Sequence, residues 1–113
     1  MTFIYHLAQA QDWDNAQKMG AYRADSLAFE GFIHCSFQEQ LKGTLEKHFK
    51  DSQELVLLKI EIENLNAEWL KENTSGGQEL FPHLYGELNL DAVSRVWPLK
   101  RPNNSPFELP ETL

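Results

Sequence analysis

The sequence predicts a single α+β domain, and three observations support this prediction. The chain has 113 residues, which is enough for one hydrophobic core but too few for two full domains. Hydrophobic residues make up 42% of it and charged residues 24%, as in folded globular proteins. Short strand-like segments alternate irregularly with a few short helical ones, without β-α-β units or the glycine-rich phosphate-binding motifs of Rossmann and P-loop domains. We expect this mixed domain to span residues 1–99.

The chain opens with a strand followed by a short helix. Residues 3–7 (FIYHL) are largely aromatic or β-branched, which is typical of a strand. Residues 12–19 begin with acidic side chains and end with a basic one, and Gly20 follows as a stop signal. This pattern predicts a helix that ends at Gly20.

A second helical turn and a second strand follow. Residues 25–29 predict a turn of helix that ends at Gly31, and residues 32–35 (FIHC) predict a short strand. Ser36 and Glu39 have the spacing of a capping box, in which two side chains satisfy the free amide groups at the start of a helix. We therefore expect the next helix to begin at Ser36.

That helix and the strand after it supply much of the predicted core. Leu41, Leu45 and Phe49 recur every four residues and form one apolar stripe. Residues 55–62 (LVLLKIEI) predict a strand at the centre of the sheet, because the first half is continuously apolar. Residues 64–73 give no clear preference for helix or strand.

The last third of the chain predicts two more strands and a tail. Residues 80–86 read as an extended segment. Because proline cannot donate a hydrogen bond, Pro82 favours either an edge strand or an irregular strand that lines a cleft. Residues 92–99 predict the closing strand. Residues 100–113 contain prolines and few apolar side chains, so we expect a poorly ordered tail that adds little stability.

Composition limits the class of function and the compartment. Seventeen acidic and ten basic residues give a net charge of −7, which disfavours broad nucleic-acid binding. Cys35 is the one cysteine, so an intrachain disulfide and a cysteine-rich metal site are excluded. The sequence shows neither an apolar run long enough to span a membrane nor the pattern of a signal peptide. We expect a cytoplasmic protein that does not contact membranes.

Three histidines, His6, His34 and His83, lie at or near the ends of predicted strands beside aromatic residues. Each one alone is most simply a half-buried ring that is hydrogen-bonded to the backbone. Together they favour a polar ligand site at the rim of a sheet, so we expect their side chains to share one cleft. A zinc site formed by the same three histidines is an alternative, although their spacing does not match a short metal-binding motif.

Strand alternation sorts the neighbours of His34 onto two faces. Phe32, His34 and Ser36 share one face and offer an aromatic ring, an imidazole and a hydroxyl to a nucleoside. Cys35 points to the opposite, apolar face. We therefore interpret Cys35 as a buried side chain and not as a nucleophile.

The segment around His83 repeats this pattern, because Phe81, His83 and Tyr85 share a face if it is extended. Arg23 and Arg95 are candidates for holding a phosphate through paired hydrogen bonds, and each is otherwise a surface ion-pair partner.

Several blocks of the sequence resemble one known family, the uncharacterised bacterial and plant proteins called domain of unknown function 952. The resemblance covers about residues 3–99 in order and omits the tail. Glu87 departs from it, since a proline is expected there after Tyr85 and Gly86. The blocks that carry the resemblance are residues 4–8 (IYHLA), 30–36 (EGFIHCS), 55–58 (LVLL), 80–86 (LFPHLYG) and 88–93 (LNLDAV).

The resemblance implies an ADP-ribosyltransferase-like fold, in which a split, bent β-structure with peripheral helices holds NAD in a cleft. In that superfamily a Tyr-His-Gly-Thr motif on the first strand binds a ribose through its histidine, and this chain matches it only at Tyr5 and His6. The superfamily's third motif supplies a catalytic glutamate, whereas the corresponding region here offers His83 and Tyr85.

The activity implied by the resemblance is cleavage of the bond between nicotinamide and ribose in NAD. His6 would then hold a ribose, Phe32 or Tyr85 would stack on a ring, and His34 and His83 would contact the phosphate or the acceptor. The alternative is a non-catalytic module that binds a small nucleotide or metabolite. A third interpretation, an adaptor that uses the proline-containing tail, lacks a P-x-x-P motif.

Overall fold

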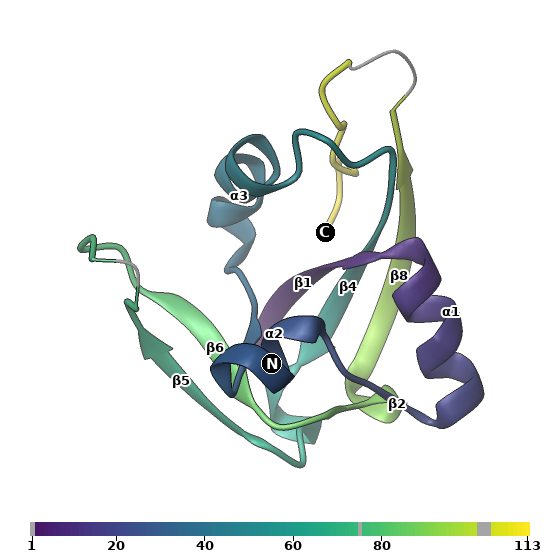
Figure 1. The fold of residues 1–113 in the computed structure, drawn as a ribbon. Helices are drawn as coiled ribbons and strands as arrows, with labels where there is room; N and C mark the ends of the chain where they lie inside the picture. The colour runs from purple at the N-terminus through teal and green to yellow at the C-terminus, as the bar shows by residue number, and fades with distance from the viewer. Residues whose placement is uncertain (1, 75, 102–104) are drawn as a thin grey trace.

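The main sheet is antiparallel and has the strand order β1-β4-β8 in the computed structural model, which describes residues 2–74, 76–101 and 105–113. Its strands are β1 (Phe3–Gln9), β4 (Glu54–Glu61) and β8 (Val93–Lys100). Strand β4 lies between the other two, as its apolar sequence predicts (Figure 1).

A second antiparallel sheet has the order β3-β6-β5 and consists of β3 (Ile33–His34), β6 (Phe81–Tyr85) and β5 (Glu68–Glu72). The short strands β2 (Ala21–Tyr22) and β7 (Leu88–Asn89) form a separate pair. Tyr5 of β1 and Ser36 exchange two backbone hydrogen bonds, of 2.8 and 2.7 Å, and so attach the chain after β3 to the main sheet.

Three α-helices lie outside the sheets, namely α1 (Ala10–Met19), α2 (Asp25–Glu30) and α3 (Leu41–His48). The first two end where the sequence predicts, because Gly20 and Gly31 adopt positive φ angles of 88° and 90° that close the helices. Single turns of 3-10 helix occupy Gln38–Gln40, Ile62–Asn64 and Leu90–Ala92. The fold is therefore α+β, as expected.

The two faces of the main sheet carry two apolar clusters. Along β4, Val56 and Leu58 belong to one cluster, while Leu55 and Leu57 belong to the other. The first cluster continues into α1 and the second sheet through Trp13, Ile33, Cys35 and Leu84, among others. The second is closed by Leu41 and Leu45 of α3, which confirms the predicted stripe.

Pro82 lies in the central strand of the second sheet, so the expectation of an edge strand is wrong. The neighbouring strand β3 pairs only through Ile33 with Leu84 and His34 with His83. Pro82 lies just beyond this ladder, where its carbonyl oxygen accepts a hydrogen bond of 3.0 Å from the amide of Cys35. The missing amide proton therefore does not interrupt the pairing.

The predicted capping box is also displaced. The amide of Phe37, and not of Ser36, donates to the side-chain oxygen of Gln40 at 2.9 Å. The hydroxyl of Ser36 is instead paired with that of Thr44 at 3.1 Å. The α-helix begins at Leu41 because a 3-10 turn precedes it.

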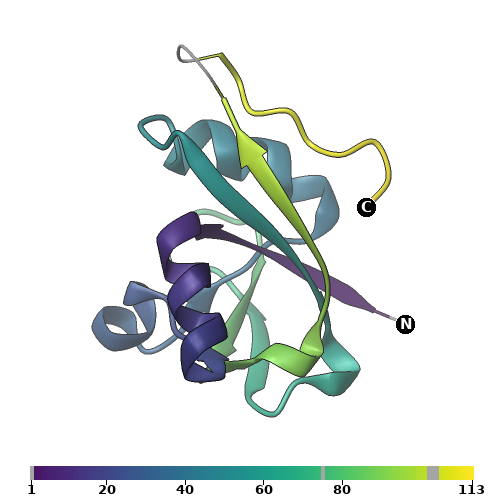
Figure 2. The ribbon, with the colours of Figure 1, turned by 90° about the vertical axis from the view of Figure 1, so that its right-hand side faces the viewer.

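The described part of the tail is packed, in contrast to the poorly ordered tail that the sequence predicts. Phe107, Leu109 and Leu113 pack against the cluster closed by α3. Arg101 donates to the carbonyl oxygens of Ser52 and Phe49 at 2.8 and 3.0 Å. Figure 2 shows the tail running back past α3. Residues 102–104 lie outside the described residues.

No helix among the described residues is both long and apolar enough to cross a membrane.

Candidate functional site

The structure brings the three strand histidines to one cavity of about 340 Å³, as the sequence predicts. His6 comes from β1, His34 from β3 and His83 from β6. Helix α3 and the end of β5 supply much of the remaining wall. The other lining residues are Leu7, Ser26, Cys35, Ser36, Thr44, Lys47, His48, Phe49, Glu72, Asn73, Thr74 and Phe81.

Sheet register places the histidines together. His34 and His83 are directly opposed across the β3–β6 pair, and their ring centroids lie 5.3 Å apart. The backbone bonds between Tyr5 and Ser36 bring β1 alongside, so that His6 reaches the same cavity. Ile33 and Cys35 belong to the first apolar cluster, as the predicted alternation of this strand requires, and Cys35 also borders the cavity.

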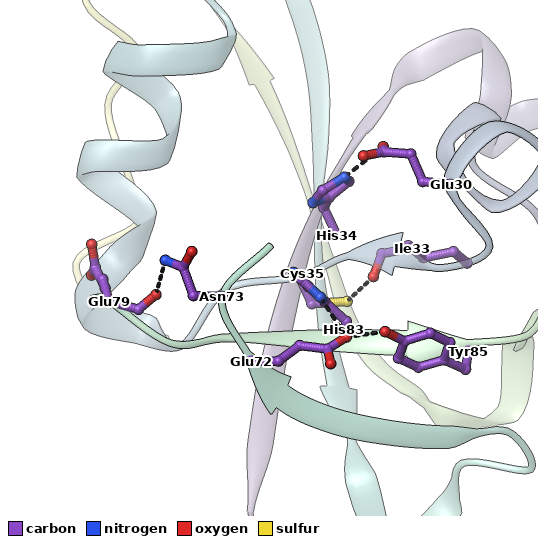
Figure 3. Close-up of polar contacts among 9 residues, drawn as sticks. All are labelled: Glu30, Ile33, His34, Cys35, Glu72, Asn73, Glu79, His83 and Tyr85. Carbon is purple, nitrogen blue, oxygen red and sulfur yellow. Dashed lines mark hydrogen bonds and ion pairs between the residues drawn. The ribbon is translucent and has the colours of Figure 1, made fainter. Parts of the chain in front are cut away.

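His83 is buried and oriented by a carboxylate, as Figure 3 shows. Its Nδ1 donates a hydrogen bond of 3.0 Å to Oε1 of Glu72, and the hydroxyl of Tyr85 donates to the same oxygen. These two bonds lower the pKa of Glu72 below its ordinary value, so this side chain is a carboxylate at neutral pH. Tyr85 does not line the cavity and acts on it only through Glu72.

The other ring nitrogen of His83 is available to a ligand. Donation from Nδ1 leaves Nε2 as the acceptor of the neutral ring, and Nε2 has no partner among the described residues. The described residues contain no buried side-chain nitrogen or oxygen without a hydrogen bond, so Nε2 is not sealed inside the protein. Because His83 lines the cavity, Nε2 is accessible from there.

Phe32 packs against the imidazole rings of both His34 and His83, the two catalytic residues that the sequence suggests. Its ring stacks on that of His83 at 4.1 Å and 15°, and it meets the edge of His34 at 4.8 Å. Phe32 is itself buried and is not among the lining residues. Phe32 therefore packs against the two imidazoles without lining the cavity, and the phenylalanines that line the cavity are Phe49 and Phe81.

His34 is also paired with a carboxylate. Its Nε2 donates to Oε2 of Glu30 at 2.8 Å, and both side chains are about half exposed. Glu30 is the last residue of α2, so that short helix orients His34 from outside the sheet. The cavity thus has two histidines, each held by its own glutamate.

His6 differs from the other two because both of its nitrogens are used. Nδ1 donates to the carbonyl oxygen of His34 at 2.6 Å, and Nε2 accepts a hydrogen bond of 2.8 Å from the hydroxyl of Tyr22. Burial lowers the pKa of His6 to about 4, so the ring is neutral at pH 7. His6 contributes wall surface and holds β3 in place, but it has no free nitrogen for a ribose.

Two further sequence candidates have partners within the protein. The Ser36 hydroxyl is paired with Thr44 and still lines the cavity. Cys35 is buried, and burial raises its pKa to about 12, so its thiol remains protonated and is a poor nucleophile.

The structure does not bring the arginine candidates to the cavity. Arg23 forms an exposed ion pair of 3.0 Å with Glu87. Arg95 lies over the ring of Trp97 at 4.7 Å. Lys47 is the only lysine or arginine among the described residues that line the cavity.

Sequence reasoning missed several residues of the site, chiefly Glu72 on β5 and Thr44, Lys47 and His48 on α3. Thr44, Lys47 and His48 follow the i, i+3, i+4 spacing of one helix face, which lies beside the apolar stripe, and this spacing is a signal that the sequence contains. For Glu72 the sequence holds no comparable signal, because its segment favours neither helix nor strand. In the described part of the chain, no group of three or more histidine, cysteine, aspartate or glutamate side chains is arranged to hold a metal ion.

Comparison with known proteins identifies relatives that cover nearly the whole chain. A crystal structure of protein CC0527 from Caulobacter crescentus is 33% identical over 95% of this chain and 94% of that one, with a TM-score of 0.83. The solution NMR structure of CC0527 is 35% identical over 92% and 90% of the two chains, with a TM-score of 0.76. No curated protein matches the sequence.

The family model described as "Protein of unknown function (DUF952)" matches residues 7–96, which include all the strands of the cavity wall apart from the first residues of β1. The chain therefore belongs to the DUF952 family.

Proposed function

We propose that the cavity binds a small nucleotide of the ADP-ribose class, such as NAD, and transfers its ADP-ribosyl group, with His83 as the general base. The observation that carries the proposal is the orientation of His83. Glu72 holds its Nδ1, and Nε2 is left as a proton acceptor inside a cavity that also contains His34. A base held in this way has its tautomer and direction fixed before the substrate binds.

The proposed reaction breaks the bond between ribose C1′ and the nicotinamide nitrogen, and the bonding electrons leave with nicotinamide. Positive charge then develops at the ribose, where the carboxylate of Glu72 stabilises it. An acceptor hydroxyl attacks C1′, and its proton passes to Nε2 of His83. His34, whose Nδ1 is not used by Glu30, contacts the acceptor or the leaving group.

Other residues hold the ligand or the catalytic groups. The hydroxyl of Ser36 is our candidate for a hydrogen bond to a ribose, and Phe81 offers a ring for stacking. Phe32, Tyr85 and His6 position the imidazoles and Glu72 from behind. The resemblance to the ADP-ribosyltransferase-like fold supports this assignment, and the division of the strands into separate small sheets fits a split β-structure.

The second candidate function is a binding module without chemistry. It is favoured by one observation: Oε1 of Glu72 already accepts hydrogen bonds from both His83 and Tyr85. A carboxylate engaged in this way has less capacity to stabilise a developing charge, although the cavity and its hydrogen-bonding groups remain.

Two measurements on the same protein separate these functions. Titration of the ¹⁵N-labelled chain with NAD and with ADP-ribose should shift the amide signals of His34, Ser36 and His83. Chromatography of the NAD mixture should then reveal released nicotinamide. If the amide signals shift but no nicotinamide is released, the protein is a binding module. If neither NAD nor ADP-ribose shifts the signals, the ADP-ribose class of ligand is rejected.

Variants test the role of His83. His83→Ala and Glu72→Gln should each lower nicotinamide release by at least about 100-fold, which is the usual contribution of a general base. Glu87→Gln is the matched control for Glu72→Gln, because it makes the same charge change outside the cavity. Because His83 is buried, the NMR spectrum of His83→Ala is used to check that this variant folds. Glu72→Gln tests the role of His83 as a base in a second way, because the imidazole is retained.

A further inference from the structure

The face of α3 that looks into the cavity combines a hydroxyl with two basic side chains. Thr44, Lys47 and His48 all line the cavity, and their i, i+3, i+4 spacing places them on one side of the helix. Leu41 and Leu45 lie on the adjacent side of the helix and are buried in the core. The helix therefore cannot rotate its basic side chains away from the cavity without exposing leucines.

The position of this face relative to the histidines is fixed by one contact. The Thr44 hydroxyl is paired with that of Ser36 at 3.1 Å, and Ser36 lies two residues after His34. Lys47 and His48 begin about one helical turn, or roughly 5 Å, further along the axis. Figure 1 shows that the C-terminal end of α3, which carries Lys47 and His48, is the end farther from β5, the strand of Glu72.

Lys47 and His48 are exposed and form no hydrogen bond or ion pair with any described residue. Three other cationic side chains are engaged: Arg23 with Glu87, Lys59 with the carbonyl of Leu113, and Arg101 with carbonyl oxygens near the end of α3. Of the lysines and arginines without such a partner among the described residues, Lys47 is the one that lines the cavity. Arg101 also offsets the negative end of the helix dipole, which would otherwise oppose an anion there.

We infer that Thr44, Lys47 and His48 form a phosphate-binding subsite, and that the ligand of this cavity carries a phosphate or diphosphate group. The inference deepens the proposed function and relies on it for the rest of the ligand. The anionic group lies against α3, and the sugar extends towards His83 and Glu72. This charge separation across the cavity orients the ligand, because a phosphate beside the Glu72 carboxylate would be repelled.

The test uses inorganic pyrophosphate as the probe and the full chain as the protein. Pyrophosphate should shift the amide signals of residues 44–48. The double variant Lys47→Gln/His48→Gln should weaken its binding by about tenfold or more, since charge-assisted hydrogen bonds are lost. Lys42→Gln is the matched control: Lys42 lies on the same helix but lines a different groove, beside Phe107. It should change the affinity by less than about twofold, because only long-range charge is altered. The subsite is rejected if the double variant and Lys42→Gln lose pyrophosphate affinity equally, or if the wild-type protein does not bind pyrophosphate.

A second titration separates this inference from the proposed function. ADP-ribose should bind more weakly to the double variant than to Lys42→Gln, whereas adenosine, which has no phosphate, should not distinguish the two. If pyrophosphate depends on Lys47 and His48 but ADP-ribose and NAD do not bind, the subsite stands and the ADP-ribose class is rejected. If ADP-ribose binds both variants equally, the class stands and the subsite is rejected.

Discussion

The imidazole of His6 donates a hydrogen bond of 2.6 Å from Nδ1 to the backbone carbonyl oxygen of His34. This bond connects β1 of the main sheet to β3 of the second sheet, at the residue whose side chain faces the cavity. The opposite nitrogen of His6 accepts from Tyr22 at 2.8 Å. The buried, neutral imidazole of His6 therefore holds the two sheets together, and it also holds the backbone of His34 in place.

The neutral state of His6 makes stability depend on pH. Its pKa is about 4 in the folded chain, compared with about 6.5 for an exposed histidine. Between these values the unfolded chain binds a proton that the folded chain does not. The contribution of His6 to the free energy of unfolding is therefore fully present above pH 6.5 and decreases as the pH falls towards 4. The difference corresponds to a loss of about 3 kcal/mol. Urea unfolding at a series of pH values measures it.

A His6→Asn variant is the comparison for this measurement. Asparagine retains a donor for the carbonyl of His34 but does not titrate. The number of protons taken up on unfolding between pH 6.5 and 4 should therefore be smaller by about one in the variant. Direct titration of the His6 ring by NMR gives the same information. A ring pKa near 6.5, or identical pH profiles for the two proteins, would show that His6 is not held neutral.

The hydroxyl of Tyr22 satisfies a buried nitrogen, and its removal should be costly. Tyr22→Phe leaves Nε2 of His6 without a partner, for which we expect a loss of about 1–3 kcal/mol in the free energy of unfolding. Tyr85→Phe is the control, because it also removes a hydroxyl that donates a hydrogen bond, but at an exposed position. Thermal unfolding should show the larger effect at Tyr22, and the reverse order would contradict this account.

The contacts of the tail predict that removing it destabilises the domain. Deletion of residues 105–113 takes away three partly buried apolar side chains and the carbonyl that binds Lys59. At about 1 kcal/mol for each half-buried side chain, the loss is about 3 kcal/mol, and the melting temperature should fall by about 10 °C. A shift of a degree or less would restore the expectation of an unpacked tail.

Local sequence patterns predicted much of this fold because they have local causes. Gly20 and Gly31 end their helices by adopting positive φ, a conformation that other residues avoid. Alternation along residues 32–35 predicted that Cys35 is buried in the apolar cluster while His34 is half exposed, since the period of a strand is fixed by its geometry.

The remaining features depend on contacts between distant segments. Glu72 meets His83 only because β5 pairs with β6 in one register, and no motif in either segment records that pairing. Pro82 is tolerated in a central strand because its neighbour β3 is two residues long. Phe107, Leu109 and Leu113 lie in a proline-containing segment that forms neither helix nor strand, so their packing could not be inferred from regular secondary structure.

His34 and Cys35 provide the last prediction, because adjacent residues on opposite faces should separate function from stability. Cys35→Ser places a hydroxyl in the first apolar cluster, and we expect it to lower the free energy of unfolding by about 1–3 kcal/mol while leaving ligand binding intact. His34→Ala removes a half-exposed ring from the cavity, so it should impair binding or turnover and change stability little.

Because the pKa of Cys35 is raised to about 12, the native thiol should also react slowly with iodoacetamide at pH 7 and rapidly after unfolding. Thermal unfolding of both variants, an NAD titration and an alkylation time course test these expectations together. Rapid alkylation of the native chain would show that the thiol is not protected by burial. Loss of activity in a fully stable Cys35→Ser protein, or in the alkylated native chain, would place the thiol in the reaction and reject the assignment of His83 as its principal base.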